Sequence, residues 1–302
     1  MKTAALIAII GNALLALLKI IAGIIANSSA LIGDGIDSTG DVLVSIVSHY
    51  VAKIMSRPAD LEHPWGHGRA ETIATAFLSF IIFFAGAQLF INSLWALFSP
   101  LTPLVPTALA FTVSIISIFG KAILAGILHL FAKRTDSLLL RANAKNMLSD
   151  ILISSGVLLS LVISKTTASS LPDIIISVMI GIWIIRTAVG IFLESNLELM
   201  DGNKSLEPYR VIMEAVSTVP QASNPHRCRM RRIAGFCDID LDISVDPHCS
   251  VAAAHKTASQ VENAIKKRLE NVFDIVIHVE PLGDKTAEAY GLSEELLNEN
   301  DE

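Results

Sequence analysis

The chain has 302 residues, of which 52% are hydrophobic and 17% are charged, and its mean hydropathy is +0.56. This composition excludes an ordinary soluble globular protein, because the apolar residues exceed what such a protein carries. The net charge of −6 and the lack of long basic runs argue against nucleic acid as a partner. We therefore expect an integral membrane protein in contact with membrane lipid.

Six apolar runs are each long enough to cross a membrane as a helix, which takes about 20 residues. They cover residues 3–26, 31–54, 71–98, 107–131, 138–164 and 171–194. Lys2 stands at the N-terminus, and lysine and arginine gather after the second and fourth runs, whereas the turns after the first and third runs have none and the turn after the fifth has only Lys165. By the positive-inside rule, we expect a multi-pass protein of the inner (cytoplasmic) membrane with both termini in the cytoplasm.

The sequence pattern changes after about residue 200. Helices are predicted over 206–219 and 251–269, and strands over 227–233, 236–245 and 273–279. This αββαβ order predicts a small α+β, ferredoxin-like domain with its helices on one face of a sheet. The expected organisation is a transmembrane domain with six helices (1–200), a cytoplasmic α+β domain (201–283) and an acidic, disordered tail (284–302).

Two of the apolar runs carry paired oxygen ligands. Asp37 and Asp41 are four residues apart in the second run, and Asn146 and Asp150 are four apart in the fifth. A spacing of four places both members of a pair on one helical face. A charge at the bilayer centre costs about 2.5–3.5 kcal/mol on insertion scales, so such residues mark functional positions. We expect the two pairs to form a cage for a single cation.

Three carboxylates and an amide make an all-oxygen ligand set. Such a set suits Mn²⁺ or Fe²⁺ better than Zn²⁺, which prefers nitrogen and sulfur, although Zn²⁺ also binds oxygen ligands tightly. An empty cage cannot keep three negative charges together in a low dielectric, so it takes up protons and releases them when metal binds. This competition predicts an exchange of metal for protons.

Other charged residues also fall within the apolar runs. Asp34 is interpreted as a residue that caps or breaks the second helix near the external interface. Lys19 and Lys121 are interpreted as side chains that snorkel to the lipid headgroups. These interpretations give none of the three a part in the cage.

The loop after the second run carries Asp60, His63 and His67. Pro64 and Gly66 interrupt any helix there, so we expect a loop of fixed shape. Imidazole and carboxylate groups suit a zinc-like divalent ion, and a polar loop at the headgroup level is the other interpretation. The chain has neither a P-loop nor a His-Glu-x-x-His motif, so we expect no nucleotide cofactor and a transporter rather than an enzyme.

These motifs resemble those of the cation diffusion facilitator family, whose members export divalent metals against protons. The resemblance covers nearly the whole chain and rests chiefly on residues 30–41, 63–71 and 141–150. It implies a transport site of Asp37, Asp41, Asn146 and Asp150, and a second metal site of Asp60, His63 and His67.

The resemblance further implies a homodimer whose cytoplasmic domains pack together and bind metal. The residues at the positions of that cytoplasmic site are His226, Asp240, His255, His278 and Glu280. Arg69 and Asp201 match a charge pair that locks the membrane domain to the cytoplasmic one. The three cysteines, Cys228, Cys237 and Cys249, are expected to serve packing alone.

Asn146 stands where zinc-moving members of the family usually carry histidine. The chain therefore resembles the manganese-type members, and we expect proton-coupled efflux of Mn²⁺, with Fe²⁺ as a further substrate, by alternating access. A zinc or iron exporter of the same architecture is the alternative within transport. A metal-sensing scaffold subunit that no longer transports is the alternative outside it.

Overall fold

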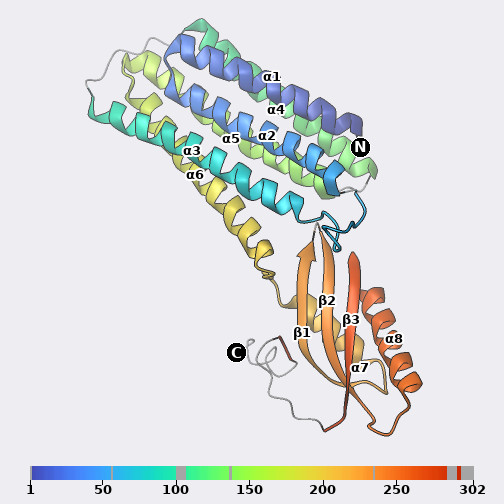
Figure 1. Cartoon of the computed structure of the whole chain (residues 1–302). Coiled ribbons are helices and arrows are strands. Elements are labelled where there is room, and N and C mark those ends of the chain that lie inside the picture. The colour runs from blue at the N-terminus through green and yellow to red at the C-terminus, as the bar shows by residue number, and fades with distance from the viewer. Residues whose placement is uncertain are drawn as a thin grey trace. The chain divides into compact units, whose positions relative to one another are not determined.

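The structure is a computed structural model of the 302-residue chain (Figure 1). It describes residues 2–55, 57–99, 107–135, 138–233, 235–283 and 291–293. The chain forms two compact units. Residues 1–56 and 73–193 make up the helical unit, and residues 57–72 and 194–302 make up the sheet unit.

Six long helices account for the six predicted spans. They are α1 (Lys2–Ala26), α2 (Ser29–Met55), α3 (Ala70–Phe98), α4 (Ala108–Thr135), α5 (Leu138–Thr167) and α6 (Leu171–Leu199). Among the described residues, five of the helices are long and apolar enough to cross a membrane. The sixth is α2, which is long enough but carries Asp34, Asp37 and Asp41. Its length of 27 residues matches that of its neighbours, so α2 differs from them in polarity rather than in length.

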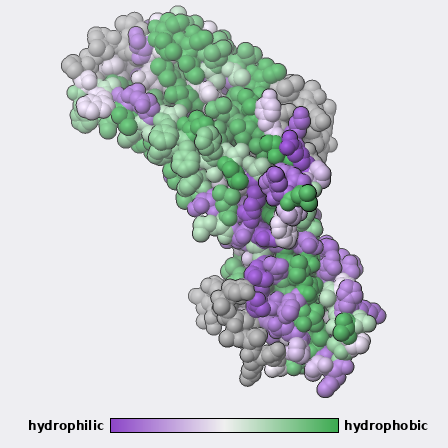
Figure 2. Space-filling view, in the orientation of Figure 1, coloured by the Kyte–Doolittle hydropathy of each residue, from purple (hydrophilic) through white to green (hydrophobic). Residues whose placement is uncertain are grey.

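The helices of the helical unit pack through small and branched apolar side chains. Ala22, Ala30, Leu31, Val157 and Ile184 form the centre of this core. Small residues let the helices approach closely, as expected for helices packed in a membrane. Large apolar side chains cover the outer surface, which Figure 2 shows as a continuous hydrophobic area over these helices. Such a surface fits contact with lipid.

The sheet unit contains the predicted αββαβ order. Its elements are α7 (Glu207–Ser217), β1 (Ser223–Ile233), β2 (Phe236–Val245), α8 (Val251–Arg268) and β3 (Val272–Pro281). Strand β2 is central, antiparallel to β1 and parallel to β3. Both helices lie on one face of the sheet (Figure 1), where Ile239, Leu241 and Ile243 of β2 pack against Ile212 of α7 and Val261 of α8. The α+β fold expected for this region is confirmed.

The strand period places the acidic residues of β2 on the opposite face of the sheet. Each of them meets an arginine of β1: Asp238 pairs with Arg231, Asp240 with Arg229 and Asp242 with Arg227. These pairs satisfy charges that α7 and α8 do not cover. The polar face of the sheet is therefore a ladder of ion pairs rather than an open acidic surface.

The predicted acidic tail is described only at residues 291–293. There Leu292 and Cys228 of β1 exchange two backbone hydrogen bonds of 2.9 Å. Residues 284–290 and 294–302 lie outside the described part of the chain. The described piece of the tail thus extends the edge of the sheet.

Candidate metal sites

Helices α2 and α5 bring the carboxylates of the predicted cage together, and Lys121 of α4 lies among them. Its Nζ contacts Asp150 and is 3.8 Å from Asp41 Oδ2. The side chains of Lys121 and Asp150 are 0% and 5% exposed. Asp37 lies one turn before Asp41 on the same face of α2. The side chain of Asn146 lies outside the described residues, although its backbone belongs to α5.

The prediction that Lys19 and Lys121 snorkel is wrong, because both are fully buried. Lys19 Nζ donates to Asp34 Oδ1 at 2.8 Å and to the hydroxyls of Ser38 and Ser154 at 3.1 Å. Each ammonium thus has a carboxylate beside it inside the helical unit. Such a partner removes the need to reach a headgroup, since a buried charge is tolerated when it is paired and hydrogen-bonded.

The interpretation of Asp34 as a helix cap or breaker is also wrong. Helix α2 continues through it, and its carboxylate accepts from Lys19 and from the Ser154 hydroxyl at 2.8 Å. The carboxylate at the start of α2 is Asp173 of α6, which accepts from the Ala30 amide at 3.2 Å and from the Ser28 hydroxyl. Sequence reasoning missed Asp173, because nothing in the sequence pairs it with the first turn of a helix far earlier in the chain.

The loop cluster of Asp60, His63 and His67 is already assembled. Two backbone amides hold Asp60 Oδ1, that of His63 at 2.7 Å and that of Glu62 at 3.0 Å. These hydrogen bonds, with the His63 amide first, keep the pKa of the Asp60 carboxyl below its ordinary value, so the group stays ionised. A turn at Gly66, with φ of +78°, brings the second histidine back toward the first.

Both imidazoles of the loop cluster face the Asp60 carboxylate. His63 Nδ1 and His67 Nε2 each lie 3.4 Å from one of its oxygens, and the two rings are 4.6 Å apart. One ligand atom from each residue lies within 4.8 Å of the others. A divalent ion bound at about 2.0–2.2 Å from such atoms needs only a small further approach. The arrangement can hold a metal ion.

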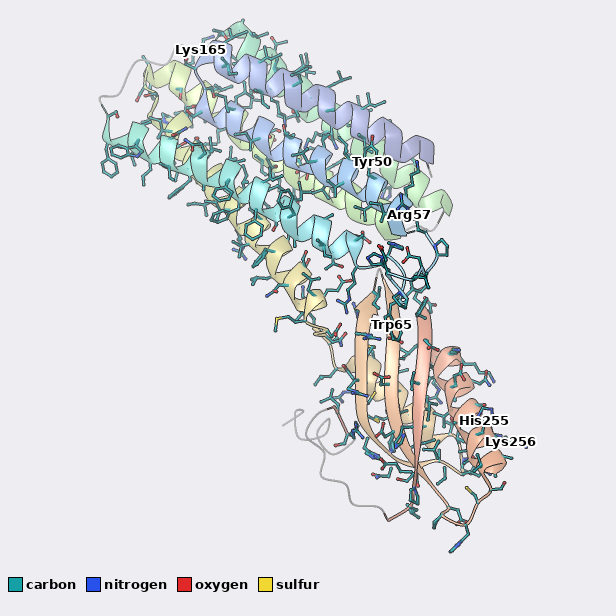
Figure 3. All side chains as sticks on the ribbon, in the orientation of Figure 1. Tyr50, Arg57, Trp65, Lys165, His255 and Lys256 are labelled. Carbon is teal, nitrogen blue, oxygen red and sulfur yellow. The ribbon has the colours of Figure 1, made fainter. Side chains whose placement is uncertain are left out.

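The same loop contacts elements of the sheet unit through Trp65 and Arg69. The Trp65 ring, labelled in Figure 3, lies 4.5 Å from the Arg231 guanidinium, which also donates to Asp238 at 2.7 Å. Arg69 contacts Asp201 and donates to the Glu198 carbonyl at 3.0 Å. The predicted charge pair therefore exists as a contact.

The predicted cytoplasmic site is brought together only in part. His226 Nε2 lies 3.3 Å from Glu280 Oε2, and His278 Nε2 lies 3.4 Å from the other oxygen of that carboxylate. His255 of α8 (Figure 3) lines the same hollow as Glu280. Asp240 is 43% exposed, lies 3.6 Å from Arg229, and does not join this group.

Asp242 takes the place that the resemblance gave to Asp240. His226, Asp242 and Glu280 each offer a ligand atom within 4.8 Å of the others, and the Asp242 side chain is 4% exposed. Sequence reasoning missed Asp242 because three aspartates alternate along this strand. Only the register, in which His226 faces Asp242, selects one of them. The same carboxylate accepts from Arg227 at 2.8 Å.

In the described part of the chain, the loop cluster and the group of His226, Asp242 and Glu280 are the sets in which three such ligand atoms meet within 4.8 Å. The cage is not among them, and an ammonium contacts two of its carboxylates. Cys228 lies in the apolar core of the sheet unit, where burial raises the pKa of its thiol to about 12. Cys228 serves packing, as expected.

Comparison with known proteins gives matches along almost the whole chain. Residues 5–200 match the sequence profile of the cation efflux transmembrane domain, and residues 205–282 match that of the cytoplasmic domain of cation efflux proteins. The uncharacterized transporter YdbO of Bacillus subtilis (strain 168) is 33% identical over 286 residues, which cover 92% of this chain and 94% of that protein.

Two further relatives have names that state an activity. The manganese efflux system protein MneS of Bacillus subtilis (strain 168) is 29% identical over 291 residues, covering 94% of this chain and 97% of MneS. The cation-efflux pump FieF of Serratia proteamaculans (strain 568) is 28% identical over 280 residues, covering 93% of this chain and 92% of FieF.

Proposed function

Since this chain belongs to the cation diffusion facilitator family of cation efflux transporters, we propose that it exports Mn²⁺ from the cytoplasm in exchange for protons. The family is one of multi-pass membrane transporters rather than enzymes, in agreement with the resemblance seen in the motifs. The proposed exporter works by alternating access, with the cage opening first to the cytoplasm and then to the outside.

The observation that carries this proposal is the meeting of carboxylates from two helices inside the helical unit. Asp37 and Asp41 come from α2 and Asp150 comes from α5, one turn beyond Asn146. All four offer oxygen, which favours Mn²⁺ and also accepts Fe²⁺. The similarity to a manganese efflux protein supports the same choice. A zinc or iron exporter of the same architecture is the alternative.

Proton coupling follows from the same carboxylates. Like charges in a low dielectric repel one another, and either a divalent ion or protons relieve that repulsion. A group couples two fluxes only if it binds both species, and carboxylates do. We propose that metal entering from the cytoplasm displaces protons, and that protons from outside displace the metal.

We further propose a homodimer in the inner membrane with both termini in the cytoplasm. The match of residues 205–282 to a cytoplasmic dimerisation domain supports the dimer. In this proposal Asp60, His63 and His67 form a second metal site, and His226, Asp242 and Glu280 form the centre of the cytoplasmic one, with His255 and His278 beside it. Arg69 and Asp201 form the interlocking charge pair.

Metal uptake into sealed proteoliposomes tests the proposal, with Mn²⁺, Fe²⁺ and Zn²⁺ compared in the wild type, Asp150→Ala and Asn146→His. We expect Mn²⁺ flux that falls at least about a hundredfold in Asp150→Ala, and a shift toward Zn²⁺ in Asn146→His. Asp173→Asn is the control, because it removes a buried carboxylate that lies outside the cage.

Two results would overturn parts of the proposal. A wild type that moves Zn²⁺ best, with the same metal preference in Asn146→His, would contradict the choice of Mn²⁺ while leaving efflux intact. No flux with any of the three metals would contradict transport itself and would favour the metal-sensing scaffold.

A further inference from the structure

We propose that Lys121 is a built-in competitor of the transported metal: its ammonium occupies the carboxylate cage when no metal is bound, and the metal must displace it. This inference rests on the proposed function. It assigns a role in metal affinity and turnover to a residue of α4, a helix that supplies none of the predicted ligands.

The geometry places the ammonium on the ligands themselves. Lys121 Nζ contacts Asp150 of α5 and is 3.8 Å from Asp41 Oδ2 of α2, so one cation connects ligands from both helices. The side chain is fully buried, so solvent does not screen its charge. An ammonium in this position neutralises part of the cage charge, as a bound metal does.

A metal ion and this ammonium cannot share the cage without a large penalty. A divalent ion binds carboxylate oxygens at about 2 Å, which brings it within a few ångströms of any cation on the same oxygens. Even with the dielectric constant of bulk water, a unit charge about 6 Å from a divalent ion weakens its binding about tenfold. A buried site screens less, so the metal binds tightly only after Lys121 moves away.

The same face of α4 offers the displaced ammonium somewhere to go. Ser117 lies one turn before Lys121 and Ser114 a further turn back, and a helical side chain leans toward the turn that precedes it. Both hydroxyls are fully buried, and neither has a hydrogen-bond partner in the described part of the chain. A lysine that turned back along α4 would meet these acceptors.

Lys19 shows what a purely structural lysine looks like in the same unit. It is equally buried, but its partners are Asp34, Ser38 and Ser154, none of which is a predicted ligand. All three polar contacts are satisfied at 2.8–3.1 Å. The difference between the two lysines is therefore the identity of the carboxylate that each one holds.

The consequence is that Lys121 lowers the affinity for metal and raises the maximal transport rate. With Lys121 in the cage, the empty transporter carries less net negative charge through the membrane and returns more readily for the next ion. The metal in turn binds less tightly and leaves more readily. Removal of the charge should therefore lower both the half-saturating metal concentration and the maximal rate.

The test is the initial rate of Mn²⁺ uptake into proteoliposomes over a range of Mn²⁺ concentrations at one fixed pH. In Lys121→Met we expect the half-saturating concentration to fall at least about tenfold and the maximal rate to fall as well. Lys121→Arg keeps the charge and should restore the wild-type half-saturating concentration. The double variant Lys19→Met/Asp34→Asn removes an equally buried ammonium outside the cage and should also keep it.

An unchanged or raised half-saturating concentration in Lys121→Met, whatever its maximal rate, would overturn the inference, because a merely structural lysine would affect folding or rate alone. If Lys121→Met does not assemble, Lys121→Gln keeps an N–H donor toward Asp150 without the charge. Equilibrium Mn²⁺ binding by that variant in detergent then replaces the flux measurement.

A wild type without Mn²⁺ flux would refute the proposed function, whereas wild-type flux with no effect of Lys121 would refute this inference alone.

Discussion

The loop cluster and the cage differ in what surrounds their carboxylates. In the loop, Asp60 and the two histidines face one another directly, with ligand atoms within 4.8 Å. In the cage, Lys121 contacts Asp150 and lies close to Asp41. Asp60 and His63 of the loop are more than half exposed, so water screens their charges, whereas Lys121 and Asp150 of the cage are buried and need each other as counter-charges. Burial therefore explains why Asp150 has a buried ammonium as its counter-charge.

In the helical unit, two buried carboxylates are each paired with a buried lysine. Lys19 of α1 holds Asp34 of the following helix, and Lys121 of α4 holds Asp150 of the following helix. Only the second pair involves a predicted ligand. The pair of Lys19 and Asp34 therefore stabilises the structure alone. In the account proposed here, metal has to break the pair of Lys121 and Asp150.

The largest expected effect on stability comes from breaking the structural pair. Lys19→Met leaves Asp34 as an unpaired buried charge and should lower the free energy of unfolding by about 3–5 kcal/mol. The double variant Lys19→Met/Asp34→Asn should lose much less, since it leaves no charge behind. Denaturant unfolding in detergent measures both, and equal losses in the two variants would show that the pair is not a unit.

The loop cluster should respond in metal affinity rather than in folding. Asp60→Asn removes the carboxylate that both imidazoles face and should weaken Zn²⁺ binding at that site at least about tenfold, or about 1.4 kcal/mol. Glu62→Gln is the matched control, because it changes an exposed neighbour outside the cluster. Calorimetric titration of the full chain distinguishes them, and equal affinities would remove Asp60 from the site.

The cytoplasmic group offers a comparison between two aspartates of one strand. Asp242→Asn should weaken Zn²⁺ binding there at least about tenfold, whereas Asp240→Asn should change it less than about twofold, because only Asp242 faces His226 and Glu280. The same titration measures both variants. The reverse order would favour the ligand implied by the family resemblance over the one that the structure brings together.

The smallest expected effect is at the contact between Trp65 and Arg231. Trp65→Ala removes a cation–π contact worth about 0.5–1 kcal/mol at an exposed position, while the bond from Arg231 to Asp238 remains. Hydrogen exchange of β1 amides should become faster by only a few-fold. No change in exchange would show that the loop gains nothing from this contact.

Helix and strand periodicity made most of the fold predictable. Apolar runs gave the six helices within a few residues, and alternation along 236–245 gave β2 with its core and polar faces. The spacing of four also placed Asp37 and Asp41 one turn apart on one face of α2. These features depend on residues close in sequence, so one chain contains enough information to find them.

The errors concern partners that are distant in sequence. The carboxylates that hold Lys19 and Lys121 come from other helices, and Asp173 reaches α2 from α6. The preference for Asp242 over Asp240 depends on a strand register with β1. Pairing across elements is set by tertiary packing, which a single sequence does not reveal.

The central claim is that one set of carboxylates carries both metal and protons. The most direct test records Mn²⁺ and proton movement simultaneously in sealed proteoliposomes with the wild type and Asp41→Asn. The account predicts protons moving against Mn²⁺ at a fixed ratio in the wild type, and loss of both movements together in Asp41→Asn. Mn²⁺ flux without proton movement in the wild type, or proton coupling that survives in Asp41→Asn, would contradict it.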